Sequence, residues 1–378
     1  MINKKRLVSR FIKYVKVDSL SKKEAKFMTL IRKELAAMGV RSVEDNAGSH
    51  IGGDSGNLYA FIKGNVKGAP RMLLNAHVDT VMPGENIKPR IRKGKIFSDG
   101  TTVLGADNKA GVSVIMEVIK TLNERKIKHG DIDVLFTVAE EIGLMGSKYV
   151  NRKFLNADFG YVLDGGDVNK MINKAPSQDS IEIKITGRAA HAGVHPEKGI
   201  NAIKVASDAI SRMKLGRIDR ETTANIGIIH GGVATNIVPE TVVIKGEARS
   251  HDMNKLKRQV RHMRKEFKKA CSKYGAKLTF QVTPSYRAFE IPVKHAAVLL
   301  AKRAAQDIGI KPNIIATGGG SDANIFSSLG LPCLIIGVGA DNVHTKKENI
   351  AIKDLVKGAE LVLSIIEGTC DLPRGKAG

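Results

Sequence analysis

The chain has 378 residues, of which 42% are hydrophobic and 26% charged, with 38 glycines and 11 prolines. This composition excludes disordered, collagenous and coiled-coil proteins, and the length allows about two or three domains of a globular protein. The 61 basic residues outnumber the 38 acidic ones and give a net charge of +23, which first raises nucleic acid, an anionic membrane or an acidic substrate as a partner.

Hydrophobic periodicity over the first 165 residues predicts helices alternating with apolar strands. The predicted elements are helices at 4–16 and 22–38, strands at 58–63, 72–76, 132–138 and 159–163, and a helix at 110–124. Ser21 and Glu24 have the spacing of a capping box, which predicts that they open the second helix, and Gly39 ends it. Strands separated by long helices predict an α/β fold with a largely parallel sheet flanked by helices.

The following segment has a different pattern and predicts a small α+β module of βαββαβ order. Its elements are a strand at 180–186, a helix at 201–213, strands at 223–229 and 241–248, a basic helix around 255–273 and a strand at 277–283. The α/β pattern then returns, with a helix at 294–308, a strand at 332–337 and a helix at 353–367. We therefore predict one domain formed by 1–176 and 289–378, with residues 177–288 inserted into it, and a disordered tail from Leu372 to Gly378.

The basic residues are spread along the chain and are densest in the predicted helix at 255–273, which also carries apolar residues at helical spacing. That combination is typical of an amphipathic helix with a solvated basic face. The chain has no tryptophan, only 4% aromatic residues, and no RNA-binding or zinc-finger pattern. We therefore expect no nucleic-acid partner.

The three cysteines are odd in number and have no Cys-x-x-Cys spacing, so they offer neither a disulfide framework nor a cysteine zinc site. No apolar run approaches the roughly 18 residues of a membrane helix, and the N-terminal region mixes charges into its apolar positions, unlike a signal peptide. We expect a cytoplasmic protein that does not interact with membranes.

Acidic and histidine side chains follow several of the predicted strands. The candidates are His77 with Asp79, Asp107 in the turn GADNKAG, Glu140 with Glu141, Asp164, and His344. Asp107 opens a helix, and the other four positions lie at or after strand ends, where ligands of open α/β sheets bind. One such residue alone is usually a hydrogen-bonded loop residue, but five positions together favour a site.

Two histidines and several carboxylates without cysteine suit Zn²⁺, Mn²⁺ or Co²⁺, and the carboxylates outnumber the needs of one ion. A bridged pair of metals about 3.5–4 Å apart can hold a hydroxide and polarise a carbonyl, which is the chemistry of amide hydrolysis. If the backbone is extended at Glu140 and Glu141, their side chains point apart, so that one binds metal and the other addresses the water.

Eight blocks in order give the chain a resemblance to the M20 di-zinc metallopeptidases, and in particular to their peptidase T-like, tripeptidase branch. The blocks are LLNAHVDTV, SDGTTVLGADNKAGV, TVAEEIGLMGS, YVLDGG, GRAAHAGVHPEKGINAI, GGVATNIVPE, GGGSDA and GADNVHTKKE. The resemblance implies a zinc-exopeptidase fold and a metal-dependent exopeptidase that hydrolyses short peptides through a metal-bridged hydroxide. It also implies two Zn²⁺ per subunit, with Co²⁺ or Mn²⁺ as alternatives.

Roles follow from the same resemblance. It implies that His77 and Asp164 bind one metal, that Glu141 and His344 bind the other, and that Asp107 bridges them. Glu140 would be the general base, and Asp79 would orient the His77 ring. The resemblance further implies a cis peptide bond between Asp107 and Asn108.

The inserted module resembles the family's lid and dimerisation domain, which implies a homodimer. In this comparison His191 supports the tetrahedral oxyanion, and Asn236 and Arg287 hold a substrate carboxylate. The alternative for Arg287 is a structural ion pair with Glu290. The segment 318–322, including Gly320, is expected to line the substrate cleft as a backbone turn, since it lacks the features of a phosphate loop or a serine nucleophile elbow.

Substrate preference stays open at this level. The family usually has Asp-Glu-Glu where this chain has Ala139 before its two glutamates, and peptidase T lacks the HAGVHPEKG form of the lid. The alternative function is a deacylase, aminoacylase or carboxypeptidase acting on N-acyl amino acids or peptides. A metal-free binding protein is disfavoured because every implied ligand and Glu140 are present.

Overall fold

The computed structural model describes residues 1–372 and divides them into two compact units. The first unit contains 1–174, 290–317 and the chain from Ser321 onward, and the second contains 175–289 with 318–320. The predicted inserted segment, 177–288, lies inside the second unit. The predicted disordered tail falls almost entirely on 373–378, which lie outside the described residues.

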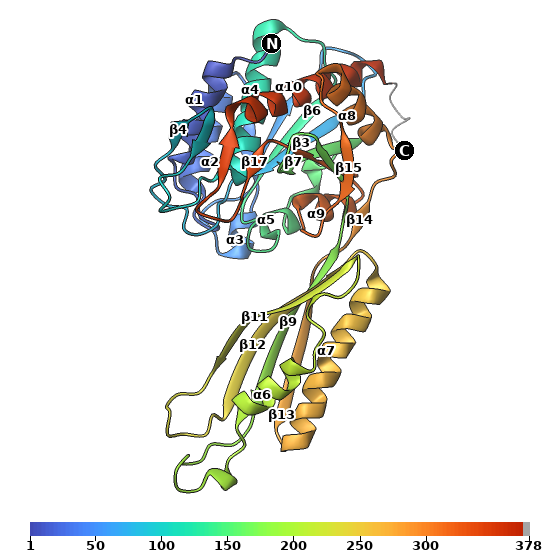
Figure 1. Ribbon diagram of the computed structural model, residues 1–378. Coiled ribbons are helices and arrows are strands. Elements are labelled where there is room, and N and C mark those ends of the chain that lie inside the picture. The colour runs from blue at the N-terminus through green and yellow to red at the C-terminus, as the bar shows by residue number, and fades with distance from the viewer. Residues whose placement is uncertain (373–378) are drawn as a thin grey trace. The chain divides into compact units, whose positions relative to one another are not determined.

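Within residues 1–372, the first unit is built on a nine-stranded mixed sheet (Figure 1). Its order is β1 (Ser42–Glu44), β2 (Leu58–Ile62), β6 (Ile132–Thr137), β3 (Met72–His77), β7 (Phe159–Gly165), β16 (Cys333–Gly337), β8 (Lys170–Ala175) and β14 (Phe289–Glu290), with β15 (Asn313–Ala316) paired to β8. The central strands β6, β3, β7 and β16 are parallel to one another. All residues of β3 and β6 are buried, as expected for parallel strands covered on both faces. The predicted α/β fold with a mixed, largely parallel sheet is confirmed.

Helices cover this sheet. They are α1 (Lys4–Val15), α2 (Ala25–Ala37), α3 (Ala47–Ile51), α4 (Ala106–Arg125), α5 (Met145–Lys148), α8 (Ala296–Asp307), α9 (Asp322–Ser328) and α10 (Ile352–Gly368), with short 3-10 turns at Arg152–Phe154 and Thr369–Asp371. The long helix α4 packs on β3 and β7 and is itself covered by α1 and α10. This packing places the first turn of α4 at the carboxyl ends of the central strands.

A second, smaller sheet in the first unit was not predicted. Its order is β17 (Ala340–Asp341), β18 (Asn349–Ala351), β5 (Lys95–Phe97) and β4 (Arg90–Arg92). Each strand has two or three residues, and β4 and β5 carry basic side chains. Strands this short have no alternating apolar run, so hydrophobic periodicity cannot detect them.

The predicted capping box at the start of α2 is wrong. The helix begins at Ala25, and Glu24 occupies its N-cap position without a side-chain capping bond. The Ser21 hydroxyl instead donates to Asp79 Oδ2 at 2.6 Å, and Glu24 Oε1 accepts the backbone N–H of Ala139 at 2.9 Å. Both side chains therefore make long-range contacts that the capping-box spacing does not predict, and Glu24 Oε1 also accepts the nearby N–H of Lys22 at 2.9 Å.

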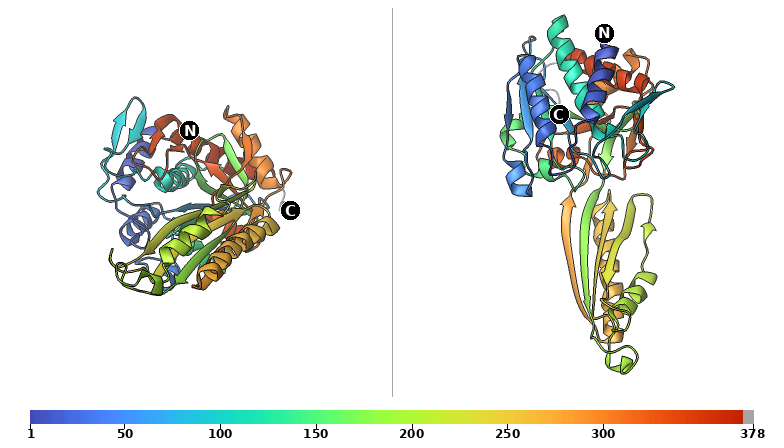
Figure 2. Two further views of the ribbon diagram at one scale, coloured as in Figure 1. Left: turned by 60° about the horizontal axis from the view of Figure 1, so that its bottom comes forward. Right: turned by 90° about the vertical axis from the view of Figure 1, so that its left-hand side faces the viewer.

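The second unit is a five-stranded antiparallel sheet with two helices packed on one face (Figure 2). The sheet order is β10 (Gly216–Arg217), β11 (Thr222–Gly231), β12 (Thr241–Ser250), β9 (Ser177–Thr186) and β13 (Lys277–Tyr286); the helices are α6 (Ala202–Ser211) and α7 (Met253–Tyr274), and Pro196–Lys198 forms a 3-10 turn. Apart from the short β10, this is the predicted βαββαβ order.

The core of the second unit lies between the sheet and its helices. Alternate residues of β9, Ile181, Ile183 and Ile185, are buried against it, as period-2 alternation requires. The helix α7 buries Leu256 and Phe267 and exposes its basic residues, so the predicted amphipathic helix is confirmed. Across the part of the chain that is described, no helix combines the length and apolarity needed to cross a bilayer.

Candidate metal centre

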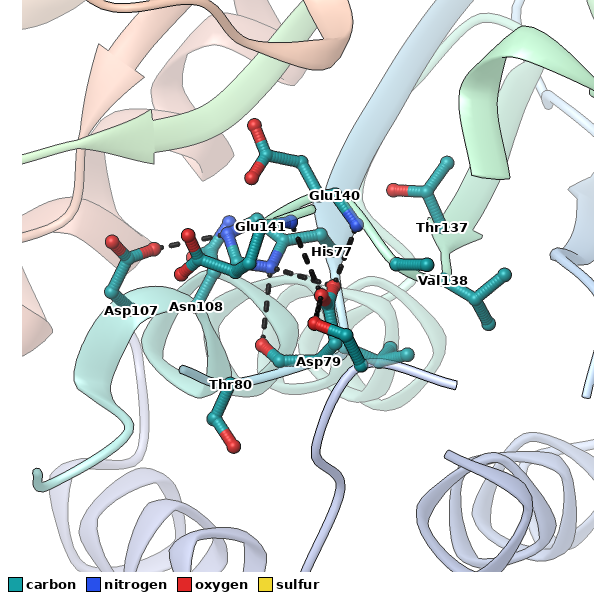
Figure 3. Close-up of polar contacts among 12 residues, drawn as sticks. His77, Asp79, Thr80, Asp107, Asn108, Thr137, Val138, Glu140 and Glu141 are labelled. Carbon is teal, nitrogen blue, oxygen red and sulfur yellow. Dashed lines mark hydrogen bonds and ion pairs between the residues drawn. The ribbon is translucent and has the colours of Figure 1, made fainter. Parts of the chain in front are cut away.

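His77 is the last residue of β3, and its buried ring meets carboxylates on both sides (Figure 3). Its Nε2 atom lies 3.0 Å from Asp107 Oδ1 and 3.6 Å from Asp164 Oδ1. Its Nδ1 atom lies 3.3 Å from Asp79 Oδ1. The parallel order of β3 and β7 causes this convergence, because it brings the ends of both strands to the same edge of the sheet.

Asp107, in the first turn of α4, lies between the two histidines. One carboxylate oxygen faces His77, and the other lies 3.3 Å from Nε2 of His344. The same His344 atom is 3.0 Å from Glu141 Oε2. The peptide bond between Asp107 and Asn108 is cis, which confirms that prediction. A carboxylate whose two oxygens face two different imidazoles has the arrangement that a metal-bridging ligand requires.

All five residues predicted as metal ligands belong to groups of potential donor atoms that lie within 4.8 Å of one another among the described residues. The groups are His77, Asp107 and Asp164; Asp107, Glu141 and His344; and His77, Glu140 and Glu141. Their donors are imidazole nitrogens and carboxylate oxygens without sulfur, which are ligands of Zn²⁺, Co²⁺ and Mn²⁺. The donor set therefore fits a pair of divalent cations.

The charges of these groups also favour a cation. Burial raises the pKa of Glu141 to about 7 and also raises the pKa of Asp164. Burial alone would lower the pKa of His77, but hydrogen bonds with Asp107, Asp164 and Asp79 outweigh it and raise that pKa well above its ordinary value. Hydrogen bonds with Asp107 and Glu141 raise the pKa of His344 to about 10. Buried carboxylates this close together need positive charge, and a metal competes for these ligands with protons.

A turn begins at Glu141, where the sequence analysis considered an extended backbone. Ala139 has a φ of +50°, and the N–H groups of Gly143 and Leu144 donate to the carbonyl of Glu140. The carboxylate of Asp79 accepts the N–H of Glu140 at 3.0 Å and the N–H of Glu141 at 3.2 Å. Asp79 therefore holds this turn as well as the His77 ring, a role that sequence analysis missed.

Further buried carboxyl groups surround the site. Burial raises the pKa of Glu140 well above its ordinary value, and the nearby negative charges of Asp164 and Asp322 raise it further despite the opposing charge of His77. Asp322, in the first turn of α9, accepts a hydrogen bond from the Thr137 hydroxyl, and burial raises its pKa to about 6. The block GGGSDA contains Asp322, but nothing in that block indicates its burial beside β6.

The remaining predicted site residues, His191, Asn236, Arg287 and Gly320, lie in the second unit. His191 is exposed, and its Nδ1 atom accepts the N–H of Gly193 at 3.2 Å. The N–H of Ala192, the residue directly after His191, donates to the carbonyl of Asn236 at 2.9 Å. The structure therefore makes His191 and Asn236 neighbours across 45 residues of sequence.

Arg287 and Gly320 lie near the end of β13. The Nη1 atom of Arg287 is 3.7 Å from the sulfur of Met253. Glu290, the ion-pair partner considered from the sequence, lies 2.9 Å from Lys174 Nζ. A Cβ atom at Gly320 would collide with the ring of Tyr286, so this position requires glycine for a close approach of the backbone. That requirement is structural and is separate from the predicted role of Gly320 in a substrate cleft.

A model of peptidase family M20/M25/M40 matches residues 73–368. An uncharacterized protein, YqjE, of Bacillus subtilis is 43% identical over 97% of this chain and 99% of its own length. The crystal structure of a tripeptidase from Staphylococcus aureus has a TM-score of 0.93 and 42% identity, covering 98% of this chain and all of its own. That of aminopeptidase PepT from Bacillus cereus has a TM-score of 0.88 and 42% identity, covering 97% and 99%.

Proposed function

The chain belongs to peptidase family M20/M25/M40, and from this membership we propose that it is a metal-dependent exopeptidase that hydrolyses short peptides. Membership makes it a hydrolase that acts on peptide bonds. The names tripeptidase and aminopeptidase carried by the two similar structures support the short-peptide substrate and cleavage at the N-terminus. The observation that carries the proposal is the pair of oxygens on Asp107, which face His77 and His344.

For the metal we propose two Zn²⁺ ions per subunit, with Co²⁺ or Mn²⁺ as substitutes. His77 and Asp164 would hold one ion, Glu141 and His344 the other, and Asp107 both. When bound, such a pair supplies Lewis-acid polarisation of the scissile carbonyl and lowers the pKa of water.

The chain's own residues then supply the proton transfers and the orientation. Glu140 accepts a proton from the attacking water at a carboxylate oxygen and delivers it to the nitrogen of the leaving amine. A carboxylate can serve in both steps, because it accepts a proton in the first and returns the same proton in the second. Asp79 keeps the His77 ring and the N–H groups of Glu140 and Glu141 in fixed positions. His191 would donate a hydrogen bond to the oxyanion.

A hydrolysis screen with Zn²⁺, Co²⁺ and Mn²⁺ added separately tests this function. We expect tripeptides to be cleaved at the first peptide bond, and N-acyl amino acids to be poor substrates. Because a guanidinium binds a carboxylate through two hydrogen bonds, amidating the C-terminus of a good tripeptide should lower kcat/KM about tenfold or more. The Arg287→Lys variant should lose much of the preference for the free carboxylate. Preferential cleavage of N-acyl amino acids would contradict the exopeptidase proposal and favour a deacylase.

We also propose a homodimer formed through the second unit. The short strand β10 pairs with only Thr223 and Ala224 of β11, so the rest of β11 is an edge of the sheet. On this edge the side chains of Ile228 and Ile229 are 46% and 47% exposed. An open edge with apolar side chains can pair with the same strand of a second copy. This supports dimerisation, and we propose that His191 of one chain serves the other chain's site.

The expected mass in light scattering is twice the 40.8 kDa of one chain, and Ile228→Lys should reduce it to the single-chain value. Ile91→Lys is the matched control, since Ile91 is an exposed isoleucine of the first unit.

Mixing inactive His191→Ala and Glu140→Ala chains should restore activity, because a heterodimer regains one intact site. Heterodimers without activity would contradict the contribution of His191 in trans.

For location we propose the cytoplasm. All three cysteines are unpaired, which is typical of a reducing compartment.

A further inference from the structure

Glu348 lies four residues after His344 and is 1% exposed. Its carboxylate accepts three backbone N–H groups from one short segment of the chain. Oε2 accepts from Leu104 at 2.7 Å and Gly105 at 2.8 Å, and Oε1 accepts from Asp107 at 2.9 Å. None of the roles assigned above involves this side chain.

The segment that Glu348 holds ends at Asp107. Both segments that meet at Glu348 contain a residue in the left-handed backbone region. Gly105 has a φ of +72° and His344 a φ of +61°. The loop 344–348 therefore contacts Asp107 at two points. His344 Nε2 faces the Asp107 side chain at 3.3 Å, and Glu348 accepts the Asp107 N–H. These contacts join two segments that are more than 230 residues apart in sequence.

We infer that Glu348 is a positioning residue that sets the direction of the Asp107 carboxylate toward both cation positions. This inference rests on the metal site proposed above. An ionised carboxylate only accepts hydrogen bonds, so it can satisfy all three N–H groups at once. An amide in the same place has one accepting oxygen, and its NH₂ group would meet an N–H donor.

A purely structural role is the alternative, because a carboxylate at the N-terminus of α4 stabilises the helix whether or not metal binds. The two roles differ in what a variant loses. Helix stabilisation predicts a lower melting temperature of the metal-free chain with unchanged metal affinity. Positioning of Asp107 predicts weaker metal binding beyond any change in the melting temperature.

The test is a Co²⁺ titration of the metal-free protein followed by its visible absorption, together with thermal unfolding of the metal-free chain. For Glu348→Gln we expect Co²⁺ affinity to fall about 10- to 100-fold, as for other residues that orient metal ligands, with a changed absorption band. Glu44→Gln is the matched control, because the Glu44 carboxylate also accepts a backbone N–H, that of Gly56 at 2.6 Å, but contacts Arg32 and Ser55 instead of the site. It should keep the native affinity and spectrum.

Native affinity and spectrum in Glu348→Gln would overturn the inference, even if its melting temperature fell. If that variant does not fold, Glu348→Asp decides, since it keeps the charge but is one methylene too short to reach all three N–H groups. We expect Glu348→Asp also to bind Co²⁺ more weakly than the native chain, and native affinity would overturn the inference. Failure of the native chain itself to bind Co²⁺ would instead contradict the proposed metal site.

Discussion

Replacing Glu140 by glutamine is expected to lower kcat at least about 100-fold while metal content stays unchanged. Glutamine has nearly the same shape as glutamate but cannot accept and return a proton near neutral pH. The N–H of Glu140, which donates to Asp79 Oδ1, is a backbone group and remains in the variant. The turn that carries Glu141 should therefore keep its conformation. Steady-state rates and elemental analysis of the purified variant measure the two quantities.

The control for this prediction is Glu141→Gln, one residue along the same turn. Glu141 is the partner of His344, at 3.0 Å between Nε2 and Oε2, so this variant should lose metal as well as activity. The assigned roles would be wrong if the Glu140 and Glu141 variants lost the same amount of metal. They would also be wrong if Glu140→Gln kept most of the native rate.

Replacing Asp107 by alanine should have the largest effect on metal binding of any single substitution in the site. Its two oxygens face the two histidines, Oδ1 toward His77 at 3.0 Å and Oδ2 toward His344 at 3.3 Å. Removing both oxygens would deprive both cation positions of a ligand. It would also remove one of the negative charges that balance the cations. We expect the variant to retain neither ion through purification and to have no measurable peptidase activity.

Asp99→Ala is a suitable control for Asp107→Ala. Asp99 lies eight residues earlier and is a half-buried acid whose side chain accepts hydrogen bonds from Thr101. It should retain the metal and rate of the native chain. If Asp107→Ala kept two ions, the bridging role would be contradicted. If it lost one ion only, Asp107 would be a ligand of a single metal.

Sequence alone predicted the α/β fold, the inserted βαββαβ module and the residues that converge in the site. The reason is physical. A strand buried on both faces, such as β3, is mostly apolar, with Asn75 as its one polar residue before His77, so the end of the strand can be recognised in the sequence. Parallel strands bring such points to one edge, which is why Asp164 could be expected beside His77 before any distance was known.

Local patterns failed where a side chain is used by a distant segment. Ser21 and Glu24 have capping-box spacing, but their oxygen atoms contact Asp79 and Ala139 instead. The turn after Ala139 includes a positive φ at that residue, and an alanine in the sequence does not predict a positive φ. At Ser21 and Glu24, hydrogen bonds to distant segments take the place of the capping-box bonds.

Composition and spacing determined which chemistry the chain can perform, because ligand types and strand ends are properties of residues and their order. Only the tertiary structure decided how the ligands are held. The three N–H groups around Glu348, the double use of Asp79 and the close approach of Gly320 to Tyr286 each join segments far apart in the chain. Such contacts leave no periodic or local trace, since a hydrogen bond or a collision depends on distance in space, and the fold alone sets that distance.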